Sequence, residues 1–201
     1  MGKRLLFLLY LGSWLVAYAQ SFEVVPGIER IFIDAQYLKF FDTDNTLSLF
    51  SRARATAEYD RQATDLFTGA YLNYTTESGF GATLLGRMAT SGSGIDVGVH
   101  YFRVKKPFMI YALPSINIGN ELRYSWFSIL RYTPKLYRDW KLYTSLELFS
   151  AFGQLGHLSS VQRIRLGVDK KGYQFGAAIN LGESRFSGTD INPGLFFRKQ
   201  F

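Results

Sequence analysis

Apolar and polar residues alternate along most of the chain. In the segment 94–105, the apolar residues Ile95, Val97 and Val99 are separated by polar or small residues. The same period of two recurs in the segments 121–132, 139–148 and 172–182. A period of two is typical of β-strands that have one apolar face, and no helical period is present beyond the amino terminus. The pattern therefore predicts an all-β protein.

Turn-forming residues divide the chain into eleven strand-like segments. These are 28–41, 46–59, 64–76, 79–90, 94–105, 107–118, 121–133, 139–151, 158–170, 172–182 and 194–201. Their spacing of about 15 residues exceeds the 8–12 that is usual in soluble β-sandwiches. It suits strands that cross a lipid bilayer at a tilt.

Aromatic residues make up 17% of the chain, and several stand at the ends of apolar faces. The clearest examples are Phe80, Tyr101, Tyr132, Trp140 and Tyr173. Transmembrane barrels place such residues in girdles at the two membrane interfaces. A soluble barrel would instead point large aromatic residues inward at mid-strand. The end positions therefore favour a membrane barrel over a soluble periplasmic barrel that binds an apolar ligand, which is one alternative.

The first 19 residues have the pattern of a secretory signal peptide. Lys3 and Arg4 precede the apolar run 5–16, and Ala17 and Ala19 fit the cleavage rule of small residues. We expect residues 1–19 to be removed and residues 20–201 to form a single domain. The formal net charge of +7 falls to +5 without the two basic residues. The chain has no Cys, which excludes disulfides, thiolate metal sites and a lipid anchor on cysteine.

The chain ends in an alternating strand, 194–201, whose last residue is Phe201. This ending resembles the C-terminal strand of small Gram-negative outer-membrane β-barrel proteins, of the Bacteroidota type, in which the terminal Phe is an assembly signal. The resemblance implies a location in the outer membrane, contact with outer-membrane lipids, and recognition by the barrel-assembly machinery. Lys199 lies on the outward face of this strand, where it can extend to the lipid headgroups.

The expected fold is a closed antiparallel up-and-down transmembrane β-barrel of ten to twelve strands with short connections on both sides. Single-chain bacterial barrels have even strand numbers, so a count of eleven needs revision. An additional short strand over 21–25 would give twelve, the number that we favour. With the last strand ending in the periplasm, the segments 150–160 and 183–193 become longer connections on the outer side.

The polar face of the strands predicts a lumen of mixed charge in which arginine predominates. Its residues are Asp34, Gln36, Arg52, Arg54, Glu58, Asn73, Arg87, Asp96, His100, Glu121, Arg123, Arg131, Lys141, Glu147, Arg163, Arg165 and Arg198. Arginine pairs bidentately with carboxylates, and isolated buried charges are costly, so we expect a paired network. Side chains fill the interior of eight-stranded barrels, whereas barrels of 16 strands hold an open channel. A barrel of ten to twelve strands lies between these sizes, so its lumen is either structural or a narrow passive pore that prefers anions.

A lipid hydrolase or acyltransferase with a site at the barrel rim is a second alternative. His157 and Ser159 lie in a connection on the outer side, and their spacing resembles the His-x-Ser pattern of outer-membrane lipid A deacylases. The orienting carboxylate and the oxyanion donor of such a site are not evident in the sequence. No motif for a metal or a cofactor is present. Basic residues alternate with acidic ones instead of clustering, which argues against binding of nucleic acid.

Overall fold

The computed structural model describes residues 20–60, 64–119, 122–185 and 188–201, and these form thirteen β-strands. The strands are β1 (Ser21–Pro26), β2 (Arg30–Phe40), β3 (Leu47–Glu58), β4 (Thr64–Thr75), β5 (Phe80–Ala89), β6 (Gly92–Lys105), β7 (Phe108–Asn117), β8 (Tyr124–Tyr132), β9 (Lys135–Tyr137), β10 (Trp140–Gly153), β11 (Gly156–Lys170), β12 (Tyr173–Ser184) and β13 (Gly188–Gln200). Within these ranges no helix has the length and apolar character needed to span a membrane. The predicted signal peptide lies outside the described residues.

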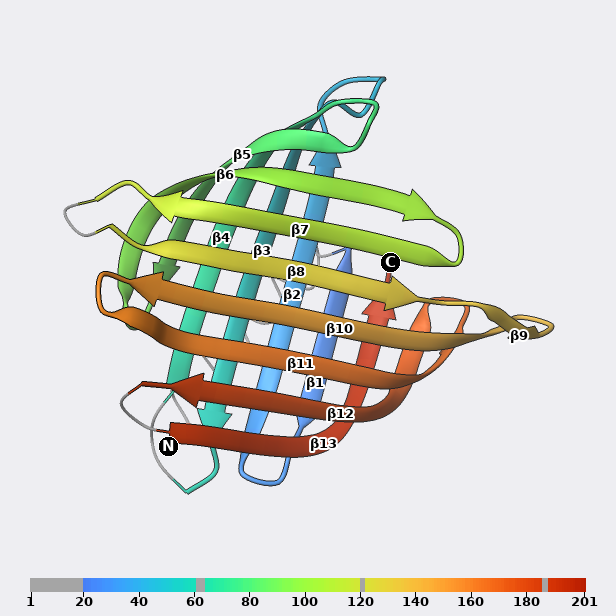
Figure 1. The fold of residues 1–201 in the computed structure, drawn as a ribbon. Helices are drawn as coiled ribbons and strands as arrows, with labels where there is room; N and C mark the ends of the chain where they lie inside the picture. The colour runs from blue at the N-terminus through green and yellow to red at the C-terminus, as the bar shows by residue number, and fades with distance from the viewer. Residues whose placement is uncertain (1–19, 61–63, 120–121, 186–187) are drawn as a thin grey trace, which may run out of the picture.

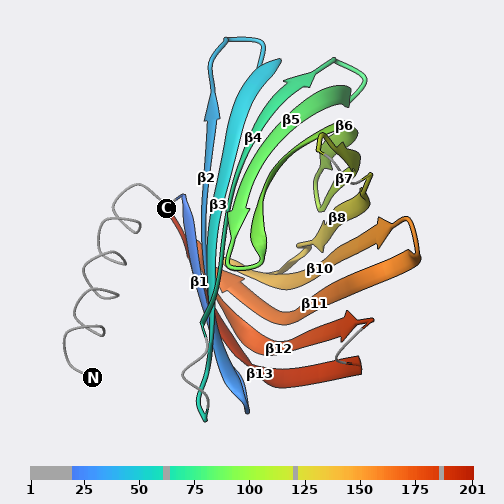
Figure 2. The same cartoon turned by 90° about the vertical axis from the view of Figure 1, so that its left-hand side faces the viewer.

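Twelve of the strands form one closed antiparallel barrel. Each strand pairs with its neighbours in chain order, β10 follows β8, and the short β9 pairs only with β10. Strand β1 closes the ring by pairing with β13, with Ser21 opposite Gln200 and Val24 opposite Phe197. Figures 1 and 2 show the barrel as a continuous wall in which β7–β13 cross steeply over β2–β5. The predicted closed barrel is confirmed.

The additional strand is β1, so the favoured number of twelve is also confirmed. The prediction of longer connections over 150–160 and 183–193 is wrong, because strands cover most of these residues. Strands β10 and β11 continue to Gly153 and from Gly156, and β12 and β13 likewise cover most of 183–193. Backbone pairing within a barrel satisfies most of the amides along these segments, which favours longer strands over loops.

The barrel has two distinguishable ends. Gln20, the first described residue, and Phe201 lie at one end, which we call the terminal end, together with the connections 41–46, 76–79, 106–107 and 171–172. The connection 171–172 is a two-residue hairpin turn in which Lys171 and Gly172 have φ values of 53° and 82°. Positive φ at both positions is the type I′ geometry that matches the twist of paired strands. The connections 27–29, 90–91 and 154–155 lie at the opposite end.

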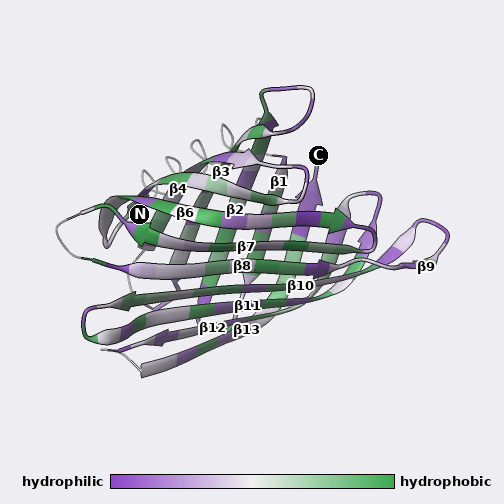
Figure 3. Ribbon diagram, turned by 45° about the horizontal axis from the view of Figure 1, so that its top comes forward, coloured by the Kyte–Doolittle hydropathy of each residue, from purple (hydrophilic) through white to green (hydrophobic). Residues whose placement is uncertain are grey.

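The outer surface of the barrel is apolar over most of its circumference. Hydrophobic and hydrophilic residues are interspersed along the strands, as Figure 3 shows. The exposed apolar residues on successive strands include Leu72, Leu84, Val97, Val99, Ile110, Ile116, Leu130, Leu166, Ile179 and Leu195. Strand β3 is weaker, because Ala53, Ala55 and Ala57 alternate there with inward-pointing arginines and Thr56.

The interior contains two apolar clusters that the sequence did not predict. One consists of Val25, Phe32, Tyr143, Ala178 and Phe196. The other consists of Tyr71, Leu85, Leu113, Phe127 and Ile129, with Phe50, Met109, Tyr111 and Phe149 packed against it. Large aromatic residues therefore occur on both faces of the barrel wall. The lumen is charged in its middle and apolar on either side.

Candidate functional site: the closed interior

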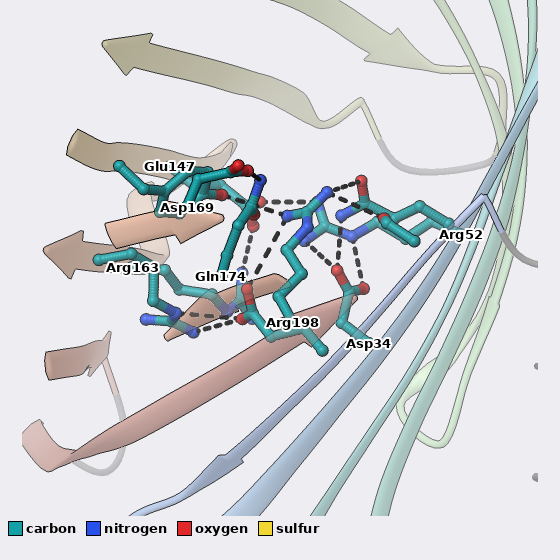
Figure 4. A network of polar contacts seen from close by, with 12 residues as sticks. Asp34, Arg52, Glu147, Arg163, Asp169, Gln174 and Arg198 are labelled. Carbon is teal, nitrogen blue, oxygen red and sulfur yellow. Dashed lines mark hydrogen bonds and ion pairs between the residues drawn. The ribbon is translucent and has the colours of Figure 1, made fainter. Parts of the chain in front are cut away.

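A network of arginines and carboxylates crosses the interior at mid-height, with Glu147 at its centre. The Glu147 carboxylate accepts hydrogen bonds from Arg54 Nη2 at 2.5 Å and from Arg163 Nη1 at 2.5 Å, and Arg52 Nη1 lies 2.7 Å from it as an ion pair. Arg52 and Arg54 lie on β3, whereas Glu147 lies on β10. In the ring of twelve strands, β3 and β10 are six positions apart in either direction. These ion pairs therefore bridge opposite walls of the barrel (Figure 4).

The second carboxylate of this network is Asp34 on β2. Arg52 binds it bidentately, from Nε at 2.7 Å and Nη2 at 2.9 Å, and Arg54 Nε lies 3.3 Å away. The Gln36 amide donates to the same carboxylate at 2.6 Å. Arg52 is thus held between two carboxylates, with only 3% of its side chain exposed. Planar guanidinium groups are suited to this geometry, and a lysine would lose the bidentate contact.

A third carboxylate, Glu23 on β1, connects the first and the last strands to β11. Arg165 Nη2 lies 3.0 Å from Glu23, and Arg198 Nη1 lies 3.8 Å from it. Arg198 also donates to the hydroxyls of Ser21 and Tyr143. The side chains of Glu23, Arg165 and Arg198 are all buried. This part of the network closes the seam between the two ends of the chain.

Toward the opposite end, the polar contacts become more exposed. Arg87 Nε donates to Asp96 at 2.7 Å, and the Asn117 amide donates to the same carboxylate at 2.9 Å. At the rim, Arg30 Nη2 lies 2.6 Å from Asp190, whose side chain is 38% exposed. Ion pairs at such exposed positions contribute little to stability.

His100 lies in a chain of neutral hydrogen bonds between β4, β5 and β6. Thr83 donates its hydroxyl proton to Asn73 at 2.7 Å, and it therefore accepts from His100 Nδ1 at 2.8 Å. His100 Nε2 in turn accepts from the Thr75 hydroxyl at 2.9 Å. The ring is 1% exposed and stacks on Tyr111 with 5.9 Å between the ring centroids. Both ring nitrogens are satisfied in the neutral tautomer, which gives His100 a structural role.

A cavity of about 530 Å³ lies in the interior at the terminal end. Its inner part is lined by residues of both kinds, including Gln36, Phe50, Asn73, His100, Met109, Tyr111, Phe127, Ile129, Arg131 and Arg198. It reaches the rim of the barrel at Phe40, Val104 and Gln200. Gln36 and Arg198, which contact Asp34 and Glu23, are the members of the polar network that line this space.

The structure places most of the sequence-predicted lumen residues on inward faces and brings many of them together. Arg123 and Lys141 are exceptions, because both are exposed. Arg123 precedes β8, which begins only at Tyr124, and Lys141 is the second residue of β10 at the terminal end. Glu58 is half-buried at the end of β3, and Glu121 lies outside the described residues.

Several residues of the interior were not predicted as lumen residues. Glu23 was missed because β1 was not assigned, although Ser21, Glu23 and Val25 alternate with Phe22 and Val24. Asp169 and Gln174, which share a hydrogen bond of 2.7 Å, flank the turn at 171–172 and were not among the predicted lumen residues. The alternation indicates an inward position for both, because Asp169 is in phase with Arg165 on β11 and Gln174 is in phase with Ala178 on β12.

The predicted pair His157 and Ser159 does not form a hydrogen bond. His157 Nε2 instead contacts Ser160 Oγ at 2.7 Å, and Ser160 Oγ lies 3.0 Å from Ser150 Oγ. Ser150 and Ser160 are direct cross-strand partners near the opposite end of the barrel. Among the described residues, no carboxylate is within hydrogen-bonding distance of His157. The constellation of a nucleophile, a base and an orienting group is incomplete.

Comparison with known proteins provides evidence on the fold alone. No family model matches the chain, and no curated protein matches it. Among solved structures, the chain is similar to the KdgM porin in complex with disordered oligogalacturonate, with a TM-score of 0.52, 12% identity, and coverage of 88% of this chain and 98% of that one. It is also similar to the NanC porin, with a TM-score of 0.56, 7% identity, and coverage of 90% and 98%. The chain thus has the barrel fold of these outer-membrane porins.

Proposed function

We propose that this protein is an integral outer-membrane β-barrel whose interior is closed, so that it serves as a structural barrel instead of an open diffusion pore. The observation that carries the proposal is the set of ion pairs from Arg52 and Arg54 to Glu147, which join strands on opposite sides of the ring. Different residues support the location in the membrane and the closure of the interior.

The outer surface supports a location in a membrane. An apolar surface of this extent has no place on a soluble monomer. At the terminal end, outward aromatic residues form cross-strand pairs, Phe80 with Tyr101 and Phe108 with Tyr132, with centroid separations of 4.8 and 4.5 Å. The ammonium group of Lys199 lies 3.5 Å from the centroid of the Tyr173 ring. Aromatic residues accompanied by lysine are typical of the interface between lipid and water.

Closure is supported by the apolar clusters as well as by the ion pairs. The rings of Tyr71 on β4 and Phe127 on β8 lie 6.5 Å apart, and those of Tyr143 on β10 and Phe196 on β13 lie 5.6 Å apart. Such contacts between non-adjacent strands narrow the interior beside the Glu147 network. Twelve strands enclose far less space than the 16–18 of aqueous porins, so side chains can fill the interior.

The route to the membrane belongs to the same proposal. Residues 1–19 have the pattern of a cleaved export signal, and Phe201 follows the last strand, as the assembly signal of outer-membrane barrels does. The backbone N–H of Phe201 donates to the carbonyl of Gln20 at 2.9 Å, at the seam of the barrel. The terminal end would then face the periplasm, with outer-membrane lipids around the barrel.

Fractionation and electrophoresis test the location. We expect the processed protein in the outer-membrane fraction, with migration in detergent gels that changes on heating. Recovery of the processed chain from the soluble periplasm would contradict the proposal.

Planar-bilayer recording tests the closure. We expect no steady current from the wild-type protein, and anion-selective openings from the double variant Arg54→Ala with Glu147→Ala, because Arg163 and Arg165 remain in the widened interior. The matched control is Arg30→Ala with Asp190→Ala, which removes an ion pair at the rim and should remain silent. Steady conductance of the wild-type protein would overturn the closed interior.

A further inference from the structure

Arg131 on β8 is an arginine of the interior for which the described residues provide neither a hydrogen bond nor a close ion pair. Its Nε is shielded from solvent and has no hydrogen bond, and no described carboxylate forms an ion pair with it. In contrast, Arg52, Arg163, Arg165 and Arg198 each lie within 4 Å of a carboxylate. Placing a cation in such a site without a counter-charge is unfavourable, because the charge loses its hydration.

The surroundings of Arg131 are those of a small-molecule site. Arg131 lines the 530 Å³ cavity at the terminal end, and this volume is within the usual range for such sites. The inner wall beside it is apolar and is formed by Phe50, Met109, Phe127 and Ile129. A site of this kind would hold an anionic head at Arg131 and a hydrophobic body along the wall.

The polar groups of the cavity indicate how much hydrogen bonding a ligand could receive. Asn73, Thr75 and His100 line the cavity but belong to the hydrogen-bonded chain that runs through Thr83. The Tyr111 hydroxyl is buried without a hydrogen-bond partner. Ser21, Gln36 and Arg198 also line the cavity, and they are hydrogen-bonded to one another. Most polar side chains of its inner part are therefore already engaged, with Arg131, Tyr111 and Ser48 as the exceptions among the described residues. A polyhydroxylated acid would lose hydration at most of its hydroxyls without replacing it.

We propose that this cavity binds a single-chain amphipathic monoanion, with a carboxylate paired to Arg131 and an apolar chain packed against Phe50, Met109, Phe127 and Ile129. The carboxylate supplies the counter-charge that Arg131 lacks, and the chain covers the exposed apolar wall. Binding depends only on the cavity. Entry from the periplasm additionally rests on the proposed function, which orients the terminal end.

The test is calorimetric titration of the protein purified from membranes and reconstituted in nanodiscs, with empty nanodiscs subtracted. The probes are octanoate, octanol and gluconate, which separate the charge from the apolar chain. We expect octanoate to bind at least about tenfold more tightly than either other probe, the discrimination typical of a shielded charge-assisted pair. Replacing Arg131 by Met should reduce octanoate affinity by about tenfold or more and remove the preference over octanol.

The matched control is Arg103→Met, which removes an exposed arginine outside the cavity near the same end of the barrel. Its octanoate affinity should equal that of the wild type. Because heat-dependent migration reports folding, the two variants are compared only as folded barrels. The proposal is overturned if octanol or gluconate binds as tightly as octanoate, or if Arg131→Met binds octanoate as well as Arg103→Met. Wild-type conductance would overturn the closed interior and leave this binding result standing.

Discussion

Replacing Glu147 by Gln should destabilise the barrel more than removing an acidic charge at its rim does. Glu147 is the common acceptor of Arg52, Arg54 and Arg163, and its side chain is 8% exposed. The amide keeps the shape but removes the charge, so Arg163 loses its ion pair and Arg54 keeps only the contact with Asp34 at 3.3 Å. Breaking a buried ion pair by removing one partner costs about 3–5 kcal/mol. That is a change of about a hundredfold to several thousandfold in the folded-to-unfolded ratio.

The assay is urea unfolding in lipid vesicles, followed by the fluorescence of Trp126 and Trp140 on the outer face. The matched control is Asp190→Asn at the rim, where the loss should be at most about 1 kcal/mol because the pair with Arg30 is partly exposed. Equal losses in the two variants would refute the reasoning that Glu147 neutralises a buried network.

A compensated variant separates charge from packing. Arg54→Met, Glu147→Leu and Arg163→Met together remove Glu147 with two of its partners, while Arg52 keeps its bidentate contact with Asp34. Well-packed apolar residues can replace a buried ion pair at little or no cost. The triple variant should therefore recover most of the stability that Glu147→Gln loses.

Three further changes test other parts of the interior and one turn. Arg131→Met should leave stability unchanged or raise it in the same urea titration without added ligand, since it removes an unpaired shielded cation; a clear loss would reveal a compensating partner. Thr83→Val should cost about 1–3 kcal/mol, because His100 Nδ1 and Asn73 Oδ1 both lose their partner; an unchanged midpoint would contradict the hydrogen-bonded chain. In the connection 41–46, the Thr46 hydroxyl and the Leu47 N–H donate to Asp42 and hold the pKa of that carboxyl below its ordinary value. The stabilisation from these hydrogen bonds is complete above the ordinary pKa of an aspartate and is lost as the pH falls through the lowered pKa of Asp42. Protection of the Leu47 amide against hydrogen exchange should therefore decrease only in strong acid.

The barrel was predictable because its signal is periodic. Alternation assigned the faces correctly in segments such as 94–105, where Val97 and Val99 are exposed and Asp96 and His100 are buried. Strand β1 escaped assignment because six residues, one of them Pro26, carry little periodic signal. Its presence followed from the need for an even number of strands, and pairing with β13 supplies the physical reason, since an unpaired edge would remain otherwise.

The interior was less predictable, because a period of two identifies two faces without saying which side chains meet. Nothing in the sequence relates Arg54 to Glu147, which are 93 residues apart. Their contact depends on the closure of twelve strands, which places β3 opposite β10. The inward aromatic residues were missed for a related reason, since Tyr71 and Phe127 occupy positions in phase with polar residues. Their packing role depends on contacts between strands that are not neighbours in the barrel.

The charged network also explains how the chain distinguishes its two faces. A shift of one residue in strand register exchanges the inward and outward side chains. With aromatic residues on both faces, hydrophobicity alone gives a weak preference for one register on strands such as β3 and β10. A shift would move Arg52, Arg54 or Glu147 into lipid, where an arginine at the bilayer midplane costs about 2–4 kcal/mol, and would also leave the remaining charges unpaired. The ion pairs therefore specify the register as well as closing the interior, and the compensated triple variant, although stable, should refold with more misregistered species than the wild type.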